Sequence, residues 1–129
     1  MKKIFILISH KLTDEQLISI NNDLHIEEVV YMPDELKKIW SNIPPTAESI
    51  KSTIAPIHDW LSKNANKGDY AIIQGDMGVT YITINFAFSL DLIPCYTTTE
   101  RITISEKDEK GTVNLIKKFK HVRFRLYEK

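Results

Sequence analysis

The sequence predicts one α/β domain, residues 1–129, in which helices flank a mostly parallel sheet and an antiparallel β-hairpin extends the C-terminal end. Two observations predict this. Up to residue 97, short apolar runs alternate with segments of helical periodicity, the pattern of right-handed β–α–β crossovers. After residue 100, β-rich runs follow one another with only a turn between them. A chain of this length, 43% of it hydrophobic, suffices for one compact core.

The first part of the chain holds two predicted strands separated by a helix. Residues 3–9 form a continuous apolar run, as expected for a strand covered on both faces, and residues 26–32 form the second strand. Thr13 is expected to cap the helix between them, because Gln16 stands at the capping-box position. A short helix is expected over residues 34–41.

A longer helix is expected after the break at Pro44-Pro45. Thr46 is its predicted N-cap, and Pro56 is expected to kink it, because proline removes a backbone hydrogen bond from the helix interior. One apolar stripe along this helix contains Ile50, Ile54, Ile57 and Leu61.

In the middle of the chain, the sequence pattern predicts a strand at residues 70–74, a tight loop at 75–78, a helix at 79–90 and a fourth strand at 93–97. The helix is apolar on nearly all sides, which predicts that it is well buried.

The last third predicts a hairpin of residues 101–106 and 112–119 that turns near Lys110-Gly111. Residues 121–127 alternate strictly between two faces. One face is expected to carry Val122, Phe124 and Leu126, and the other His121, Arg123, Arg125 and Tyr127.

Charge is divided unevenly along the chain, although the net charge is zero. Residues 1–100 carry 8 basic and 13 acidic side chains, whereas residues 101–129 carry 9 basic and 4 acidic side chains. Such asymmetry is typical of an anion-binding face, but lysines on a solvated strand edge also deter aggregation. The charge count leaves both interpretations open.

The candidate site lies where ligands bind in open α/β sheets, beyond the carboxyl ends of the strands. If the second and third strands flank the first, two loops become neighbours there. The first loop is Ser9-His10-Lys11. The second contains Gln74, Gly75, Asp76, Met77 and Gly78.

These residue types suit a nucleotide ligand. Gly75 and Gly78 allow close backbone approach, and free amides at the start of the following helix favour phosphate. Glycines in such a turn also occur for geometry alone, so both interpretations stay open. His10 is the candidate acid–base group, because imidazole titrates near neutral pH. Hydroxyl, amide and charged groups for ribose, base and phosphate are offered by Ser9, Lys11, Gln74, Asp76 and Thr80.

Several other classes find little support in this sequence. No G-x-G-x-x-G motif follows the first strand, so the Rossmann-like arrangement lacks the main signal for NAD or FAD. No His, Cys and carboxylate cluster has metal-ligand spacing, and Ser9 lacks the G-x-S-x-G elbow of hydrolases. We therefore expect no metal and no cofactor. No apolar run is long enough to cross a membrane, and one cysteine suits a reducing, cytoplasmic compartment.

Four segments, ILISHKLTDEQ, VVYMPDELKKIWSNIPP, DYAIIQGDMGVTY and FKHVRFRLYEK, resemble in order and spacing the small stand-alone CARF-type ring nucleases of type III CRISPR systems. The resemblance covers essentially the whole chain. It implies a CARF-type domain that forms a homodimer and cleaves cyclic tetra-adenylate, without metal, to linear products with a 2′,3′-cyclic phosphate. The resemblance implies that the family's signature residues correspond to Ser9, His10, Lys11, residues 74–78, and also Trp40, His121, Arg123 and Arg125.

In the implied reaction the substrate's own 2′-hydroxyl is the nucleophile, so geometry and charge stabilisation on phosphate suffice. His10 and Lys11 are the candidate catalytic residues. Trp40 is a candidate for stacking on a base, although a tryptophan on a short amphipathic helix is also typical of a core.

Two other functions remain open. A non-catalytic sensor or sponge would bind the ring without cutting it. A nucleic-acid-binding module would use the basic C-terminal strand, but zero net charge argues against it, and we expect no long nucleic acid as partner.

Overall fold

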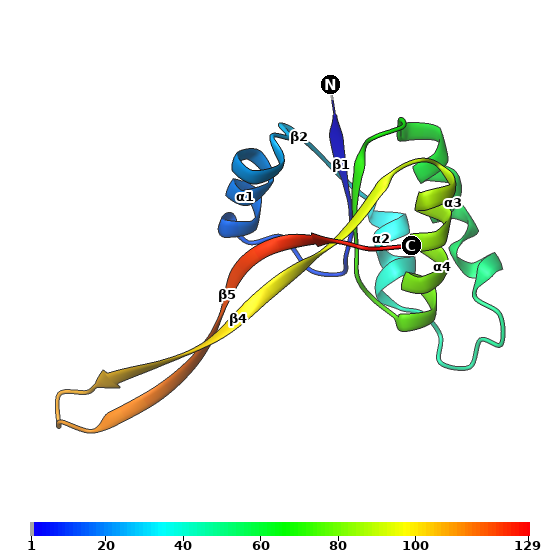
Figure 1. Ribbon diagram of the computed structural model, residues 1–129. Coiled ribbons are helices and arrows are strands. Elements are labelled where there is room, and N and C mark those ends of the chain that lie inside the picture. Colours follow the sequence, from blue (N-terminus) through cyan, green and yellow to red (C-terminus); the bar gives the residue numbers. More distant parts are fainter. Residues whose placement is uncertain (1) are drawn as a thin grey trace.

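The computed structural model describes residues 2–129, which form a curled five-stranded sheet in the order β2-β1-β3-β4-β5 with helices on both sides (Figure 1). The first four strands are mutually parallel, and β5 runs antiparallel to β4. This confirms the predicted α/β architecture and its antiparallel C-terminal pair. The elements of the described residues are β1 (Lys3–Leu7), α1 (Asp14–Leu24), β2 (Glu28–Tyr31), α2 (Asp34–Ser41), α3 (Lys51–Asn64), β3 (Tyr70–Ile73), α4 (Met77–Ser89), β4 (Ile93–Lys107) and β5 (Val113–Leu126).

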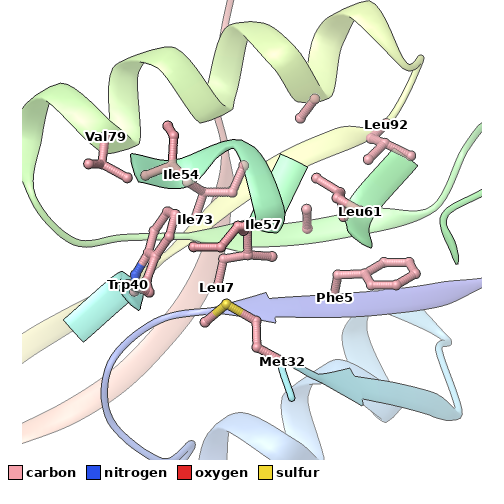
Figure 2. Packing of buried hydrophobic residues seen from close by; sticks show 12 residues of the cluster. Phe5, Leu7, Met32, Trp40, Ile54, Ile57, Leu61, Ile73, Val79 and Leu92 are labelled. Carbon is pink, nitrogen blue, oxygen red and sulfur yellow. The ribbon is translucent and has the colours of Figure 1, made fainter. Parts of the chain in front are cut away.

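Strand β1 is buried on both faces, as its continuous apolar run predicts. Ile4 and Ile6 point into the core layer beneath α1, and Phe5 and Leu7 point into the opposite layer. The second layer is formed with α2, α3 and α4, and Figure 2 shows its packing around Trp40, Ile54, Ile57, Leu61, Ile73 and Val79. The two layers hold the carboxyl ends of the strands in fixed positions.

Helix α1 begins at its predicted cap. The Thr13 hydroxyl accepts a hydrogen bond from the Gln16 backbone N–H at 3.2 Å, and the Gln16 side chain accepts one from the Thr13 N–H at 2.9 Å. This reciprocal pair is the expected capping box. It fixes the point at which the chain leaves the loop after β1 and enters the helix.

Helix α3 begins later than predicted. Its N-cap is Ile50, whereas Thr46 lies in a turn in which the Ala47 N–H donates to the Pro44 carbonyl at 3.1 Å. Because this turn separates the diproline from the helix, Thr46 caps no helix and that prediction is wrong. Pro56 does lie inside α3, as expected.

Helix α4 begins earlier than predicted and is less buried than predicted. Asp76 caps it, so Gly78 lies in its first turn rather than in a loop. Met77 and Tyr81 are 88% and 70% exposed, because α4 packs with one side only against α3, β3 and β4. The prediction of a well-buried helix is therefore wrong, and α4 keeps an uncharged face open to solvent.

The C-terminal third forms two long strands rather than four short ones. Strands β4 and β5 pair, with one register shift, as far as Lys107↔Val113, and Gly111 takes a φ of 78° in the closing turn. The predicted hairpin is confirmed. Beyond the sheet it projects as a two-stranded ribbon (Figure 1), and we call residues 99–107 and 113–121 the arm.

A register shift in the β4–β5 pairing changes the predicted faces of β5. The pairing passes from Arg123 to His121 and leaves Val122 as an additional residue, which forms a bulge. The His121 ring therefore contacts Phe124, with ring centroids 4.9 Å apart, although strict alternation predicted opposite faces. The bulge separates His121 from the arginines with which it was expected to share a face.

Candidate functional site

The carboxyl ends of β1 and β3 bring the two predicted loops side by side. Leu7 pairs with Ile73, and the Gln74 backbone N–H donates to the Leu7 carbonyl at 3.1 Å. Because β2 lies on the other side of β1, the strand order confirms the predicted neighbourhood of the loops. Three polar side chains of the first loop are exposed, namely Ser9, His10 and Lys11.

Gln74 fixes the second loop to the neighbouring elements. Its Oε1 accepts hydrogen bonds from the backbone N–H and the hydroxyl of Thr97, both at 3.0 Å. Its backbone carbonyl accepts a hydrogen bond from the Trp40 indole N–H, also at 3.0 Å. The side-chain oxygen is thus engaged within the fold, which leaves the NH₂ group of Gln74 to meet a ligand.

Trp40 is a core residue that supports this loop from below. Its side chain is only 3% exposed, so no ring face is open for a base to stack on. A Cβ atom built on Gly75 would lie 2.9 Å from the indole nitrogen. Gly75 is therefore required by the packing of Trp40, and the expected stacking role of Trp40 finds no support.

The start of α4 arranges the remaining groups of the second loop. Asp76 Oδ1 accepts a hydrogen bond from the Val79 N–H at 3.0 Å, so this carboxylate occupies a donor that was expected to face phosphate. The Thr80 hydroxyl is buried and has no hydrogen-bond partner among residues 2–129. An unpaired buried hydroxyl is unfavourable, but this oxygen is shielded from solvent, so it does not face a ligand in this structure.

Two surface pockets lie at this edge of the sheet. The first, which we call the α4 pocket, has a volume of about 370 Å³. Its wall is fixed by Tyr127, whose hydroxyl donates to the Ile73 carbonyl at 2.8 Å, and burial raises the pKa of Tyr127. The pocket is lined by Gln74, Gly75, Met77, Thr80, Tyr81, Ile84 and Tyr127.

The second pocket, which we call the His10 pocket, has a volume of about 410 Å³ and lies between β1, β2 and the starts of α1 and α2. Its floor is aliphatic and consists of Ile6, Ile8, Leu12, Leu17 and Met32. Its rim is polar and consists of His10, Lys11, Tyr31, Asp34 and Lys37. Apolar surface with a few converging polar groups is typical of a small-molecule site.

Sequence reasoning did not find Tyr31, Asp34 and Lys37. A signal was available, because these residues follow the second predicted strand, whose carboxyl end lies at the same edge as the first. The structure thus adds an aromatic ring, a carboxylate and a second lysine to the predicted pair His10 and Lys11. The α4 pocket and the His10 pocket share no lining residue, so the predicted site is divided between them, and Ser9, Asp76 and Gly78 line neither.

The basic residues of β5 contact other parts of the molecule. The His121 backbone N–H donates to the Glu15 carboxylate at 3.3 Å, and both His121 ring nitrogens are buried without a partner in the described chain. Burial lowers the pKa of His121, partly offset by two nearby carboxylates. Arg125 donates to the Tyr96 hydroxyl at 3.1 Å. His121, Arg123 and Arg125 do not line the α4 pocket or the His10 pocket.

Other chemistry has few candidates among residues 2–129. Burial raises the pKa of Cys95 to about 12, so its thiol stays protonated near neutral pH and is a poor nucleophile. In this range no three His, Cys, Asp or Glu side chains are grouped as metal ligands. Nor does any helix of these residues combine the length and hydrophobicity that a membrane span requires.

Comparisons with known proteins match the chain over nearly its full length. The family described as "Uncharacterized protein MJ1673 family" matches residues 2–125. A similar protein of Methanocaldococcus jannaschii, "Uncharacterized protein MJ1673", is 47% identical over 129 residues, which cover 98% of each chain. No solved structure matches the chain.

Proposed function

Because the chain belongs to the MJ1673 family, whose description names no activity, we propose its function from the site. The protein is a ring nuclease that binds cyclic tetra-adenylate and cuts it to linear products with a 2′,3′-cyclic phosphate. Its α/β domain is then a Rossmann-like domain of CARF type, and its reaction ends type III CRISPR signalling. The observation that carries this proposal is the His10 pocket at the carboxyl edge of the sheet.

The His10 pocket suits one adenosine unit of such a ring. The aliphatic floor accepts the flat face of a purine, and the half-exposed ring of Tyr31 offers a stacking surface. Asp34 is a hydrogen-bond acceptor for the exocyclic amino group of adenine. Lys11 and Lys37 place positive charge at the rim, where the phosphates of the ring pass.

The proposed reaction uses the nucleophile that the substrate brings. The 2′-oxygen attacks the adjacent phosphorus atom while its proton passes to the His10 imidazole, and the 5′-oxygen leaves and takes a proton from solvent. Lys11 stabilises the charge that develops on the phosphate oxygens. Alignment of the 2′-oxygen with the leaving oxygen is the main contribution of the pocket.

We further propose that the protein acts as a two-fold homodimer through α4. This helix carries no charged residue, and its outer face exposes Met77 and Tyr81. An uncharged exposed helix face is typical of an interface between subunits. A ring of four equal nucleotides matches two equal subunits, and the α4 pocket borders this face, so the α4 pockets of both subunits would meet the ring.

The function is tested by incubating the protein with cyclic tetra-adenylate and, separately, cyclic hexa-adenylate in EDTA, followed by chromatography. We expect linear products from the tetra-adenylate, with more than one ring cut per dimer. Tight binding of the ring without any product would overturn the nuclease activity and would favour the non-catalytic sponge. If neither ring binds, the proposal that the ligand is a cyclic oligoadenylate is overturned. Turnover that needs an added divalent ion would overturn the metal-independent mechanism.

A further inference from the structure

The arm projects from the edge of the sheet at which the candidate site lies. Leu7 pairs with Ile73 and Ile72 pairs with Cys95, so β4 reaches the carboxyl ends of β1 and β3 near residue 96. It then continues to Lys107, and at 3.3 Å per residue the arm extends roughly 35 Å past that edge. Figure 1 shows the ribbon standing clear of the helices.

The two faces of the arm differ in charge and in exposure. One face, which we call the basic face, carries three cations, no carboxylate and three exposed apolar side chains: Arg101, Lys107, Lys117, Val113, Leu115 and Phe119. The opposite face carries two lysines, two carboxylates and half-buried isoleucines that cover one another: Lys118, Lys120, Glu100, Glu106, Ile102, Ile104 and Ile116. Only the basic face therefore exposes both charge and apolar surface without cover.

The apolar side chains of the basic face are exposed to water, so their burial against another surface would be favourable. Leu115 and Phe119 are 70% and 72% exposed, and a two-stranded ribbon without further packing is only marginally stable in water. The arm leads away from its own sheet (Figure 1), so among residues 2–129 its tip has no surface to lie on. A second copy of the chain is the partner that is always present.

The carboxyl edge of the sheet has the complementary charge. Five exposed carboxylates stand at the starts of α1, α2 and α4, namely Asp14, Glu15, Asp34, Glu35 and Asp76. Among the residues that line the His10 pocket, only two lysines, Lys11 and Lys37, oppose the negative charge of these carboxylates. Because carboxylates outnumber lysines at this edge, the edge attracts a basic ribbon. Without such a ribbon, its negative charge disfavours the binding of a ligand with four phosphates.

We propose that the arm of each subunit lies with its basic face across the carboxyl edge of a second copy. There the arm covers its exposed apolar side chains, pairs with the carboxylates of the edge and adds cations beside the ring phosphates. The ring-binding part of this inference rests on the proposed function, whereas the docking of the arm on a second copy does not. The carboxyl edge of each subunit is then incomplete as a ring-binding surface without the arm of the other subunit.

The docking is tested first by oligomeric state, without any ligand. In one variant residues 103–117 are replaced by Asn-Gly, which closes the hairpin at the pair Ile102↔Lys118 with a favoured two-residue turn. We expect the dimer dissociation constant, measured by light scattering across a dilution series, to rise by about tenfold or more. An unchanged constant, with an unchanged melting temperature as evidence of folding, would overturn the proposal.

A matched pair of charge reversals tests which face docks. Arg101→Glu with Lys117→Glu alters the basic face, and Lys118→Glu with Lys120→Glu makes the same charge change on the opposite face. We expect the first pair to weaken the dimer several-fold more than the second, and more at low salt than at high salt. Equal effects would show that net charge, rather than docking of one face, controls association, and would overturn the proposal.

Mixing two defective chains tests whether the arm acts on the other subunit. The arm-shortened chain keeps an intact edge, and a chain with Lys11→Glu keeps an intact arm. We expect each alone to bind labelled cyclic tetra-adenylate weakly and the mixture to regain part of the binding, because in a heterodimer one intact arm lies on one intact edge, a pairing that neither homodimer has. No recovery in a mixture shown to form heterodimers would overturn the shared site. If the wild type binds no ring, the function fails, while the dimer measurements still decide the docking.

Discussion

At the scale of single residues, the structure separates groups that face solvent at the carboxyl edge from groups that hold this edge in place. His10 and Lys11 are exposed on the rim of a pocket, so they are free to meet a ligand. Trp40 and Gly75 belong together as a buried ring and the residue that makes room for it. The carboxyl edge thus contains residues whose substitution should change the proposed reaction and residues whose substitution should change the fold.

His10→Ala tests the proposed proton transfer. We expect the single-turnover rate of ring cleavage to fall roughly a hundredfold, the usual contribution of general acid–base catalysis, while the dissociation constant for the ring changes little. The melting temperature should be unchanged, because His10 is exposed. An unchanged rate at saturating protein would remove His10 from the mechanism, and a parallel loss of binding would make it a ligand contact only.

Gly75→Ala and Gly78→Ala form a matched pair for stability. A methyl group on Gly75 would lie 2.9 Å from the Trp40 indole nitrogen, so the buried ring or the loop must move, at a cost of about 1–3 kcal/mol. On Gly78 it would lie 3.2 Å from the movable end of Ile50, within a helix that favours alanine by about 1 kcal/mol. Urea denaturation should show a loss for Gly75→Ala and no loss, or a gain, for Gly78→Ala. Equal losses would contradict this account.

At the scale of elements, helices α3 and α4 are joined by a half-buried histidine. The His58 ring stacks on Phe86 with centroids 4.3 Å apart, and His58 Nε2 lies 3.0 Å from the Thr83 hydroxyl. Burial lowers the pKa of His58, and the Asp59 carboxylate offsets part of this effect. The contact between the two helices is thus built for a neutral imidazole.

The lowered pKa of His58 predicts how stability depends on pH. Below the unfolded-state pKa of 6.5, the unfolded chain binds a proton that the folded chain resists, so the contribution of His58 is present above this pH and is lost as pH falls. We expect the melting temperature of His58→Gln to fall less than that of the wild type between about pH 7.5 and pH 5.5. His10→Ala, which removes an exposed histidine, is the control and should keep the wild-type slope. The same slope for His58→Gln would refute this contribution.

At the scale of the whole molecule, two surfaces of the described residues expose large apolar side chains beside the candidate site. One is the uncharged outer face of α4, and the other is the basic face of the arm. Both adjoin the carboxyl edge, where the acidic starts of the helices and the two pockets lie. A dimer that uses both surfaces would cover the exposed apolar side chains and supply the positive charge that a cyclic polyanion needs.

Tyr81→Lys tests the part of α4 in this dimer. The side chain is 70% exposed, so a lysine should leave the melting temperature of the monomer nearly unchanged. In an interface the same lysine would be buried without a partner, and we expect the dimer dissociation constant to rise by roughly tenfold or more. Val122→Lys, at an exposed apolar position on the β5 bulge, serves as the control and should not change the constant. If the two substitutions have equal effects, α4 is not the interface.

The sequence by itself determined the parallel strands, the C-terminal hairpin, the start of α1 and the neighbouring loops, because these depend on local periodicity, on capping by Thr13 and on the rule that parallel strands present their carboxyl ends together. The tertiary structure alone decided the rest. The burial of Trp40, the exposed face of α4 and the bulge at Val122 depend on which elements pack together and in what register, and no local pattern encodes these long-range contacts. Tyr31, Asp34 and Lys37 follow the second predicted strand and so belong to the same edge as His10 and Lys11, but only the packing of β1, β2, α1 and α2 joined them in one pocket.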